Sequence, residues 1–489
     1  MNTDLATENE QLRAENEQLC AENATLRQRI AELEELVAKL EAELAQIKGQ
    51  LEEAERAGKR QAAPFSKGPP KAHPKRPGRK AGHSPAHRPR PERVDRVLEA
   101  KLPPVCPSCG GELVDHEVKE QLLVDIPPVE PIVTQFNVHV AYCANCGKRV
   151  QGRHPEQISD ALGAAAVQIG PRALGLAAEL KHGMGIPYRK VERVLSKGFG
   201  LDVCSGGLAR SGQRLTRQAK PTYAQMILQL RESKVVNGDE TSWKIDGEKA
   251  WLWTFTDEEV TVYVIDPTRA HEVAERVLGK EFKGVLGCDC FPAYDPLEYR
   301  QQKCLGHLLR RCSRIALVQS DEAVAFSQQV AHLLRRAMQL KKRRAEMSPH
   351  GYLVARGKVG ATLDRLLNQE VSDPENAKLV KLLTKQRHRL LTFLYVEEVD
   401  PTNNIAERRI RPAVIVRKIS AGNRSDRGSE THAILTSIIQ TCRQQEKDFL
   451  DVATHLLRSP QPRALNLMTE KHEDESTRSG HSAAQPRAP

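Results

Sequence analysis

Residues 235–241 read VVNGDET, a short apolar run that ends at Asp239. Residues 285–289 repeat this pattern as VLGCD and end at Asp289, whereas residues 403–409, NNIAERR, begin a basic segment that contains Glu407. Short apolar runs predict buried strands, and the basic segment predicts a helix. Three acids carried by two strands and a helix are typical of a carboxylate site for two hard cations that act on phosphodiesters.

The segments around these acids follow a definite order. The expected elements are strands over 235–245, 250–255 and 260–265, a helix over 271–278, and a fourth strand over 285–289. Asp246-Gly247 is a hairpin turn between the first two strands. This is the opening order of a ribonuclease-H-like α/β domain, in which the first and fourth strands lie side by side. We therefore expect Asp239 and Asp289 to be neighbours, in a catalytic domain over 234–457 with a helical insertion over about 305–395.

Residues 1–57 are predicted to form a coiled coil. Leucine or isoleucine recurs every seventh position from Leu5 to Ile47, and asparagine, isoleucine, valine or leucine follows each of them four residues later. Such a seam predicts a parallel homodimer, in which Asn9, Asn16 and Asn23 set the register at a cost in stability. A lone solvated helix is the alternative, and it would leave the seam exposed.

Residues 58–95 form a basic linker. Between Gly58 and Pro91 there is no acid, and ten lysines and arginines alternate with eight prolines. Proline at this density excludes a helix, and the composition predicts a disordered segment that lies along phosphates without reading sequence. A solvated spacer is the alternative. The predicted DNA contacts in the linker are Lys75, Arg76, Arg79 and Lys80.

Four of the eleven cysteines form two CxxC pairs, each closed by a glycine. An intracellular chain of this size does not need a disulfide framework. The spacing predicts a zinc ribbon over 96–155 that holds one structural Zn²⁺. A redox CxxC motif would not account for the second pair. The predicted ligands are Cys106, Cys109, Cys143 and Cys146.

Residues 156–233 read as helices. A glycine turn over 198–201 joins two of them, and Ser205 is placed to cap the second. Helix, short glycine turn and helix are compatible with a helix-turn-helix DNA reader, and equally with a plain helical hairpin. Residues 458–489 are polar, and we expect a disordered tail there.

The bulk composition agrees with a nucleic-acid partner. The 489-residue chain has a formal net charge of +11, which favours DNA or RNA over a membrane surface. No apolar run approaches the roughly 18 residues that span a bilayer, and the acidic, polar start is unlike a signal peptide. We expect a cytoplasmic, DNA-associated bacterial protein.

In these motifs the chain resembles the DDE transposases of the insertion-sequence sixty-six family, the TnpC-type transposases. The resemblance runs from the coiled coil to about Leu457. Cys290 stands where the family pattern leads us to expect a glycine after the second acid. The motifs that carry the resemblance are Asp-Glu-Thr at 239–241, Asp289 with Tyr294, Cys304-Leu305-Gly306-His307 with Arg310 and Arg311, and NNIAER at 403–408 with Arg417-Lys418.

The resemblance implies a catalytic triad of Asp239, Asp289 and Glu407 with two Mg²⁺ (or Mn²⁺) ions. Asp239 would bridge both ions, and each of the other acids would hold one. The enzyme would bind the ends of its element, cleave there and join the 3′-OH to target DNA, with companion proteins expected. The basic residues expected to contact DNA are His307, Arg310, Arg311, Arg408, Arg411, Arg417 and Lys418.

Other interpretations of the same residues remain open from sequence. The two aspartates can be polar strand ends, Glu407 can complete a capping box after Asn404, and Asp295 is a weaker rival to Asp289. Glu240 should face the other side of its strand and is not counted as a ligand. At the level of function, the alternative is a non-enzymatic, zinc-containing dimeric DNA-binding regulator, and a coiled-coil scaffold explains little beyond residues 5–51.

The coiled coil yields the first prediction. A protein that lacks residues 1–57 should sediment as a smaller species than the full chain, because it has lost the apolar seam that joins two copies. Analytical ultracentrifugation of both proteins measures this. Equal association states would remove the coil as the dimer contact.

Overall fold

The computed structural model describes residues 2–59, 88–115, 117–318 and 321–467. The chain divides into two compact units, Met1–Ala100 and Lys101–Pro489. The predicted linker contacts Lys75, Arg76, Arg79 and Lys80 lie outside the described residues, and so do residues 468–489 of the tail.

The first unit contains one long helix, α1 (Asn2–Lys59). Its side chains are described over 17–47, and the apolar seam there is open to solvent, with Leu26 and Ile47 each 61% exposed. An apolar stripe of this length on a single helix needs a partner surface. Dimerisation through α1 stays a prediction.

The second unit begins with extended chain and a small hairpin. Strands β1 (Val140–Tyr142) and β2 (Arg149–Gln151) pair antiparallel. Their pairing joins Val140 with Gln151 and Tyr142 with Arg149.

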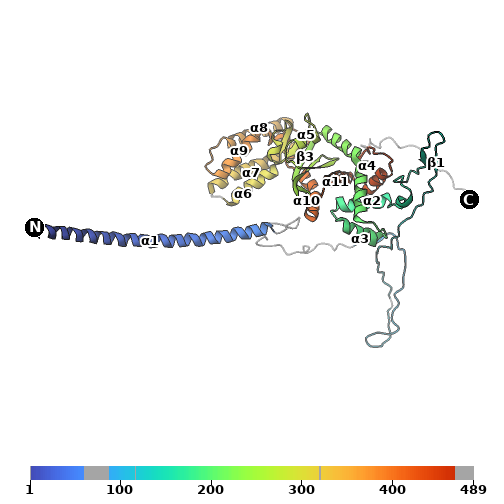
Figure 1. Cartoon of the computed structure of the whole chain (residues 1–489), viewed down its shortest axis with the longest axis horizontal. Helices are drawn as coiled ribbons and strands as arrows, with labels where there is room; N and C mark the ends of the chain where they lie inside the picture. The colour runs from blue at the N-terminus through green and yellow to red at the C-terminus, as the bar shows by residue number, and fades with distance from the viewer. Residues whose placement is uncertain (1, 60–87, 116, 319–320, 468–489) are drawn as a thin grey trace. The chain divides into compact units, whose positions relative to one another are not determined.

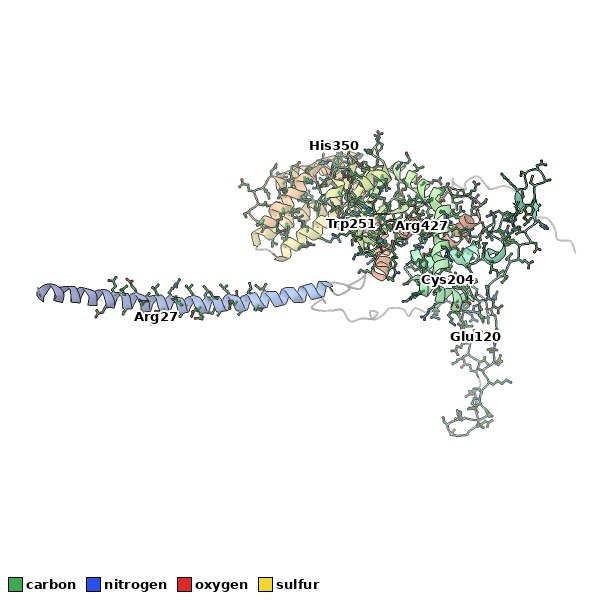
Figure 2. All side chains as sticks on the ribbon, viewed as in Figure 1. Arg27, Glu120, Cys204, Trp251, His350 and Arg427 are labelled. Atoms are coloured by element: carbon green, nitrogen blue, oxygen red, sulfur yellow. The ribbon has the colours of Figure 1, made fainter. Side chains whose placement is uncertain are left out.

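A helical segment follows the hairpin. It comprises η1 (Gly163–Ala165), α2 (Pro171–Ala178), η2 (Glu179–Gly183), α3 (Tyr188–Phe199) and α4 (Ser205–Glu232). The turn between α3 and α4 passes through Gly200 at φ 63°, a left-handed conformation that suits glycine. The cap of α4 differs from the prediction, because Ser205 donates its hydroxyl to Glu192. Cys204, which is labelled in Figure 2, caps the helix instead. Its sulfur accepts the Gly207 amide at 3.4 Å.

A five-stranded mixed sheet forms the centre of the second unit (Figure 1). Its order is β5-β4-β3-β6-β7, and β3 and β6 are neighbours that run parallel, as predicted. The last strand was not predicted, because RQQK has no apolar residue, yet Gln301, Gln302 and Lys303 are buried. The elements are β3 (Val235–Ile245), β4 (Glu248–Thr256), β5 (Thr261–Asp266), α5 (Glu272–Leu278), β6 (Val285–Cys288), η3 (Pro292–Tyr294) and β7 (Arg300–Lys303).

Helices cover both faces of this sheet. On one face, α4 and α5 pack on Trp253, Phe255 and Leu286 in the largest core cluster. On the other face, α10 (Asn404–Ser420) packs on Trp243 and Leu252. The alternation of side chains along β3 thus sends odd-numbered residues toward α10 and even-numbered residues toward α4 and α5.

The edge strand β5 is protected by side chains of a buried helix, α11 (Asp426–Gln444). Thr441 accepts the Thr261 amide at 3.0 Å, and Ser437 accepts the Tyr263 amide at 2.8 Å. These hydroxyls satisfy donors that an exposed edge would offer to another chain. The last helix is α12 (Phe449–Arg458).

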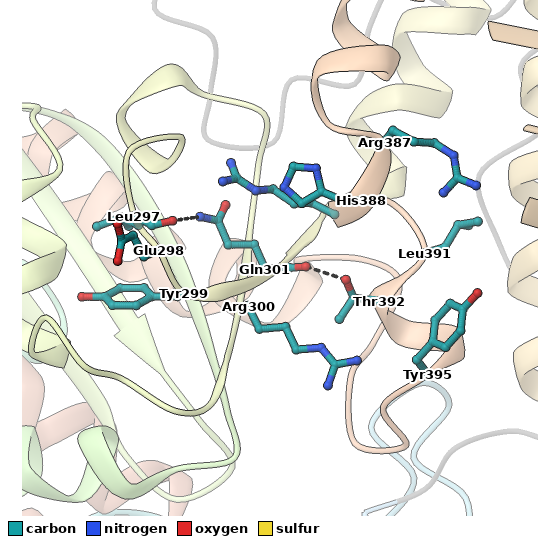
Figure 3. A pocket seen from close by; sticks show the side chains of 11 residues that line it. Leu297, Glu298, Tyr299, Arg300, Gln301, Arg387, His388, Leu391, Thr392 and Tyr395 are labelled. Atoms are coloured by element: carbon teal, nitrogen blue, oxygen red, sulfur yellow. Dashed lines mark hydrogen bonds between the residues drawn. The ribbon is translucent and has the colours of Figure 1, made fainter. Parts of the chain in front are cut away.

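The predicted insertion is helical throughout its described residues. It comprises α6 (Leu305–Val318), α7 (Asp321–Lys342), η4 (Arg344–Glu346), α8 (Pro349–Leu367), α9 (Pro374–Lys385), η5 (Arg387–Arg389) and η6 (Thr392–Leu394). Its end docks on β7, where Thr392 donates to the Gln301 carbonyl at 2.6 Å. A cavity of about 550 Å³ lies beside this joint (Figure 3). Of its three arginines, Arg389 pairs with Asp295 at the joint, and Arg387 pairs with Asp364 within the insertion.

Asp295 fastens the insertion to the sheet. Its carboxylate contacts Lys385 at 2.7 Å, Gln386 at 2.6 Å and Arg389 at 3.4 Å. Burial by itself would raise the pKa of Asp295, but the hydrogen bonds from Lys385 and Gln386 outweigh it and the pKa lies below its ordinary value. Asp295 is therefore engaged in a structural ion pair, which argues against it as a rival to Asp289.

Residues 459–467 begin the segment that is expected to be a disordered tail, and two leucines in it contact the core. The Leu465 amide donates to Thr222 at 3.0 Å, and Leu467 is 3% exposed in the main core. Two leucines in a polar segment are enough to hold it against α4. Among the described helices, none combines the length and apolarity needed to cross a bilayer.

Asp295→Asn should lower the free energy of unfolding by roughly 2 kcal/mol at neutral pH, because it leaves a partly buried cationic cluster without its counter-charge. A carboxylate with a depressed pKa contributes stability above its unfolded pKa and loses that contribution as the pH falls through its folded pKa. The difference between the two proteins should therefore shrink in acid. Denaturant titrations at several pH values measure it, and exposed Glu298→Gln is the control. A gap that is independent of pH would contradict the charge argument.

Candidate active site

The parallel pairing of β3 and β6 brings the two aspartates into register. The paired residues are Val235 with Val285, Val236 with Leu286, and Asn237 with Gly287. Continuing this register by two residues places Asp239 opposite Asp289, on the same face of the sheet. Asp239 lies within β3 rather than at its end, whereas Asp289 follows the last residue of β6.

Asn403 attaches the start of α10 to β3 on that face. Its side-chain amide donates to the Gly238 carbonyl at 2.7 Å, and its side-chain oxygen accepts from the Asn237 amide at 2.9 Å. A Cβ atom on Gly287 would lie 2.4 Å from Nδ2 of Asn237, so glycine there leaves room for the pair. Glu407, one turn into α10, is thereby held over the strand that carries Asp239.

Glu407 is not a capping residue. The N-cap of α10 is Asn403, whose side chain is used on β3 and makes no cap hydrogen bond. The Glu407 carboxylate instead contacts Arg310 at 3.1 Å and His307 Nδ1 at 3.7 Å, both on α6. The capping-box alternative is therefore wrong, and the helical insertion supplies one wall of the site.

The electrostatics of Asp239 reflect a crowded acidic site. The pKa of Asp239 is raised to about 7, first by burial and then by the neighbouring charges of Glu240, Asp289 and Glu407, against one opposing backbone hydrogen bond. Mutual repulsion among carboxylates that share a site is relieved when a cation binds between them. The donor set is all oxygen, which fits Mg²⁺ or Mn²⁺.

Glu240 lies on the opposite face, as the strand alternation predicts, but it is not idle. Its side chain is 1% exposed, and it accepts from Arg269 at 2.7 Å and from the Tyr294 hydroxyl at 2.5 Å. The Arg269 guanidinium stacks 3.4 Å from the Phe291 ring. Through Phe291 and Tyr294, this network supports the loop after Asp289 from the face of the sheet opposite Asp239. Arg269 was missed by the sequence reasoning, since a single arginine in a turn carries no local signal.

The predicted basic residues separate into two groups. His307 and Arg310 face Glu407, and Arg311 is half-buried on the same helix. Arg408, Arg411 and Lys418 are exposed on α10. Arg417 is already engaged, because its guanidinium donates to Thr241 at 2.7 Å and to the Ser242 carbonyl at 2.6 Å. Its DNA contact stays a prediction, whereas its bond to β3 is a structural role.

The two CxxC pairs form matching knuckles. Gly110 and Gly147 adopt left-handed φ angles of 74° and 66°. The amides of Ser108 and Cys109 lower the pKa of Cys106, and those of Cys146 and Asn145 lower the pKa of Cys143. Amides directed at sulfur stabilise thiolates, the form that binds zinc. Within the described residues, no three of the four sulfurs lie within 4.8 Å of one another. In such domains zinc binding and final folding are one event.

Comparison with known proteins identifies the family of the chain. Residues 166–431 match the transposase IS66 family, and residues 103–147 match the zinc-finger binding domain of transposase IS66. The first match covers more than half of the chain, which therefore belongs to the transposase IS66 family, a class of transposase-type nucleases and transferases.

Two similar curated proteins come from Sinorhizobium fredii, and both are described as uncharacterized. Protein y4qI is 24% identical over 416 residues, which is 76% of this chain and 75% of the relative. Protein y4jD is 25% identical over 406 residues, or 75% of each chain.

The clamp of α10 on β3 gives a stability prediction with a matched control. Asn403→Ala should lower the free energy of unfolding by about 1–3 kcal/mol, because the Gly238 carbonyl and the Asn237 amide lose their partner in a buried place. Asn404→Ala is the same change at the exposed next residue. Its free energy of unfolding should stay within about 0.5 kcal/mol of the wild-type value. Denaturant titration compares them. Equal effects would mean that Asn403 is not the clamp.

Proposed function

We propose that this protein is a DNA transposase with a ribonuclease-H-like catalytic domain. Asp239, Asp289 and Glu407 hold two Mg²⁺ (or Mn²⁺) ions. The observation that carries the proposal is the convergence of Asp239 and Asp289 on adjacent parallel strands with Glu407 on the helix clamped over them. The sheet order β5-β4-β3-β6-β7, with helices on both faces, supports the ribonuclease-H-like assignment.

The reaction is cleavage at the ends of the element followed by strand transfer. Bound Mg²⁺ would activate an oxygen nucleophile and stabilise the leaving oxygen. In the first step a water oxygen replaces the 3′ oxygen of the strand on phosphorus and releases a 3′-OH. In the second step that 3′-OH attacks a phosphorus of target DNA and displaces the 3′ oxygen of the target strand. Each step breaks one P–O bond and forms another, so no covalent bond to the protein is needed.

The residues of this chain supply position and charge. The Asn403 clamp fixes Glu407 relative to Asp239, and the Glu240 network fixes the loop of Asp289. Arg310 and His307 stand beside Glu407, where an incoming phosphate would lie. Arg310 is 60% exposed, so it can turn from Glu407 to a phosphate at small cost.

Binding of DNA is distributed over several parts. The α3–α4 pair fits a helix-turn-helix reader, and α3 exposes Arg189, Lys190, Arg193 and Lys197. Arg408, Arg411 and Lys418 extend the basic surface along α10. The zinc ribbon and the basic linker add further contacts, and α1 joins two copies. We also propose that the protein acts with companion transposition proteins and that it is located in the cytoplasm.

The triad should be required for cleavage and dispensable for binding. Asp239→Asn and Glu407→Gln each remove one negative charge with little change in shape. Strand cleavage should fall by orders of magnitude, because two closely spaced cations need all three carboxylates against their mutual repulsion. The assay is cleavage of a labelled element end in Mg²⁺, beside a gel shift on the same DNA.

The control is Glu248→Gln, an exposed acid paired with Ile245. It lies six residues along the strand from Asp239, or roughly 20 Å. Glu240→Gln is a poorer control, because it breaks a buried ion pair with Arg269. If both triad variants cleave like wild type, the proposed enzymatic function is wrong. A non-enzymatic DNA-binding regulator would then be the better interpretation.

A further inference from the structure

One group of side chains at the site has a different chemistry from the acidic triad. The ligand atoms of Cys304, His307 and Glu407 all lie within 4.8 Å of one another, and in the described part of the chain no other three histidine, cysteine or acidic residues come so close. Sulfur, imidazole and carboxylate together are the donors that Zn²⁺ prefers, whereas Mg²⁺ takes oxygen. The triad does not account for Cys304.

Cys304 is built into the chain as the zinc-ribbon cysteines are. It is 1% exposed, at the start of α6, and its sulfur accepts the Asn403 amide at 3.2 Å. The amides of Gly306 and His307, two and three residues ahead, also point to this sulfur, although burial keeps the pKa of the Cys304 thiol above its ordinary value. Cys106 likewise receives the amides two and three residues ahead, from Ser108 and Cys109. Residues 304–307, CLGH, therefore form a CxxH knuckle.

His307 supplies the second ligand of such a knuckle, at the position that a cysteine occupies in the ribbon. Its Nδ1 atom is buried and makes no hydrogen bond with any described residue. It lies 3.7 Å from the Glu407 carboxylate. A buried ring nitrogen without a partner is costly, and a metal ion would satisfy it.

We propose that Cys304, His307 and Glu407 form a second zinc site, and that zinc bound there inhibits the enzyme by taking Glu407 from the Mg²⁺ centre. Three protein ligands leave the fourth position of a tetrahedral zinc ion open. Glu407 cannot complete this site and serve the triad in the same geometry. The inhibitory role rests on the proposed transposase function, whereas the zinc site itself does not.

Zinc content tests the site without any reference to activity. Full-length protein dialysed against buffered Zn²⁺ should hold two zinc ions per chain. Cys304→Ser should hold one, and so should Cys109→Ser, because each removes a ligand from a different site. Cys312→Ser changes another buried cysteine of α6 and should keep two. One zinc ion per chain in the wild-type protein, or two zinc ions per chain in Cys304→Ser, would overturn the site.

Co²⁺ identifies the ligands directly. Added to zinc-free Cys109→Ser, it should produce a thiolate-to-cobalt charge-transfer band that is absent from the zinc-free Cys109→Ser/Cys304→Ser protein. Circular dichroism of each variant confirms that it is folded. A band of equal strength in both proteins would assign the sulfur to another cysteine and reject the knuckle.

Inhibition is then measured on the Mg²⁺-dependent cleavage of an element end, as the ratio of rates with and without Zn²⁺ in each protein. Half-inhibition should require roughly tenfold or more zinc in Cys304→Ser than in wild type. Equal sensitivity would overturn the regulatory role. A wild-type protein that cleaves no DNA in Mg²⁺ would contradict the proposed function, and the zinc content would still decide the site.

Discussion

The parallel pairing of β3 with β6 is the constraint on which the site depends. It sets Asp239 and Asp289 side by side, and the contact between Asn237 and Gly287 in the same register leaves room for Asn403. A shift of β3 by one residue against β6 would send Asp239 to the face opposite Asp289, because side chains alternate along a strand. The attachment of α10 to β3 therefore depends on the register in which β3 pairs with β6.

The two faces of β3 divide the charge between binding and support. The α10 face carries Asp239 and remains partly open, which leaves its acids to a cation. The opposite face buries Glu240 with Arg269 and Tyr294, where a neutralised ion pair is the form of charge that a core tolerates. Adjacent acids in the sequence therefore have unlike roles, and a charge at residue 240 stabilises the loop that carries the second acid of the site.

Glu407 is a point at which the insertion contacts α10 beside the sheet. It is reached from β3 through the Asn403 clamp and from α6 through Arg310, His307 and Cys304. A carboxylate within reach of both oxygen-rich and sulfur-containing partners can respond to different metal ions, because hard and borderline-soft cations select different donors. Through the proposed CxxH knuckle, zinc on the insertion would control the chemistry of the acids on the sheet.

Local patterns in the sequence determined the heptad seam, the cysteine knuckles, four of the five strands of the central sheet, the helical insertion and the three acids, since each is carried by spacing or by an apolar run. They did not reveal β7, whose buried glutamines and lysine look exposed in sequence, or Leu465 and Leu467, which hold part of the tail. The tertiary structure alone decided that Glu240 supports the loop after Asp289, that Asp295 pairs with the insertion, that Arg417 bonds to β3, and that Cys304 faces Glu407. These roles depend on partners distant in the chain, and only the packing of one element on another brings such charges and sulfurs together.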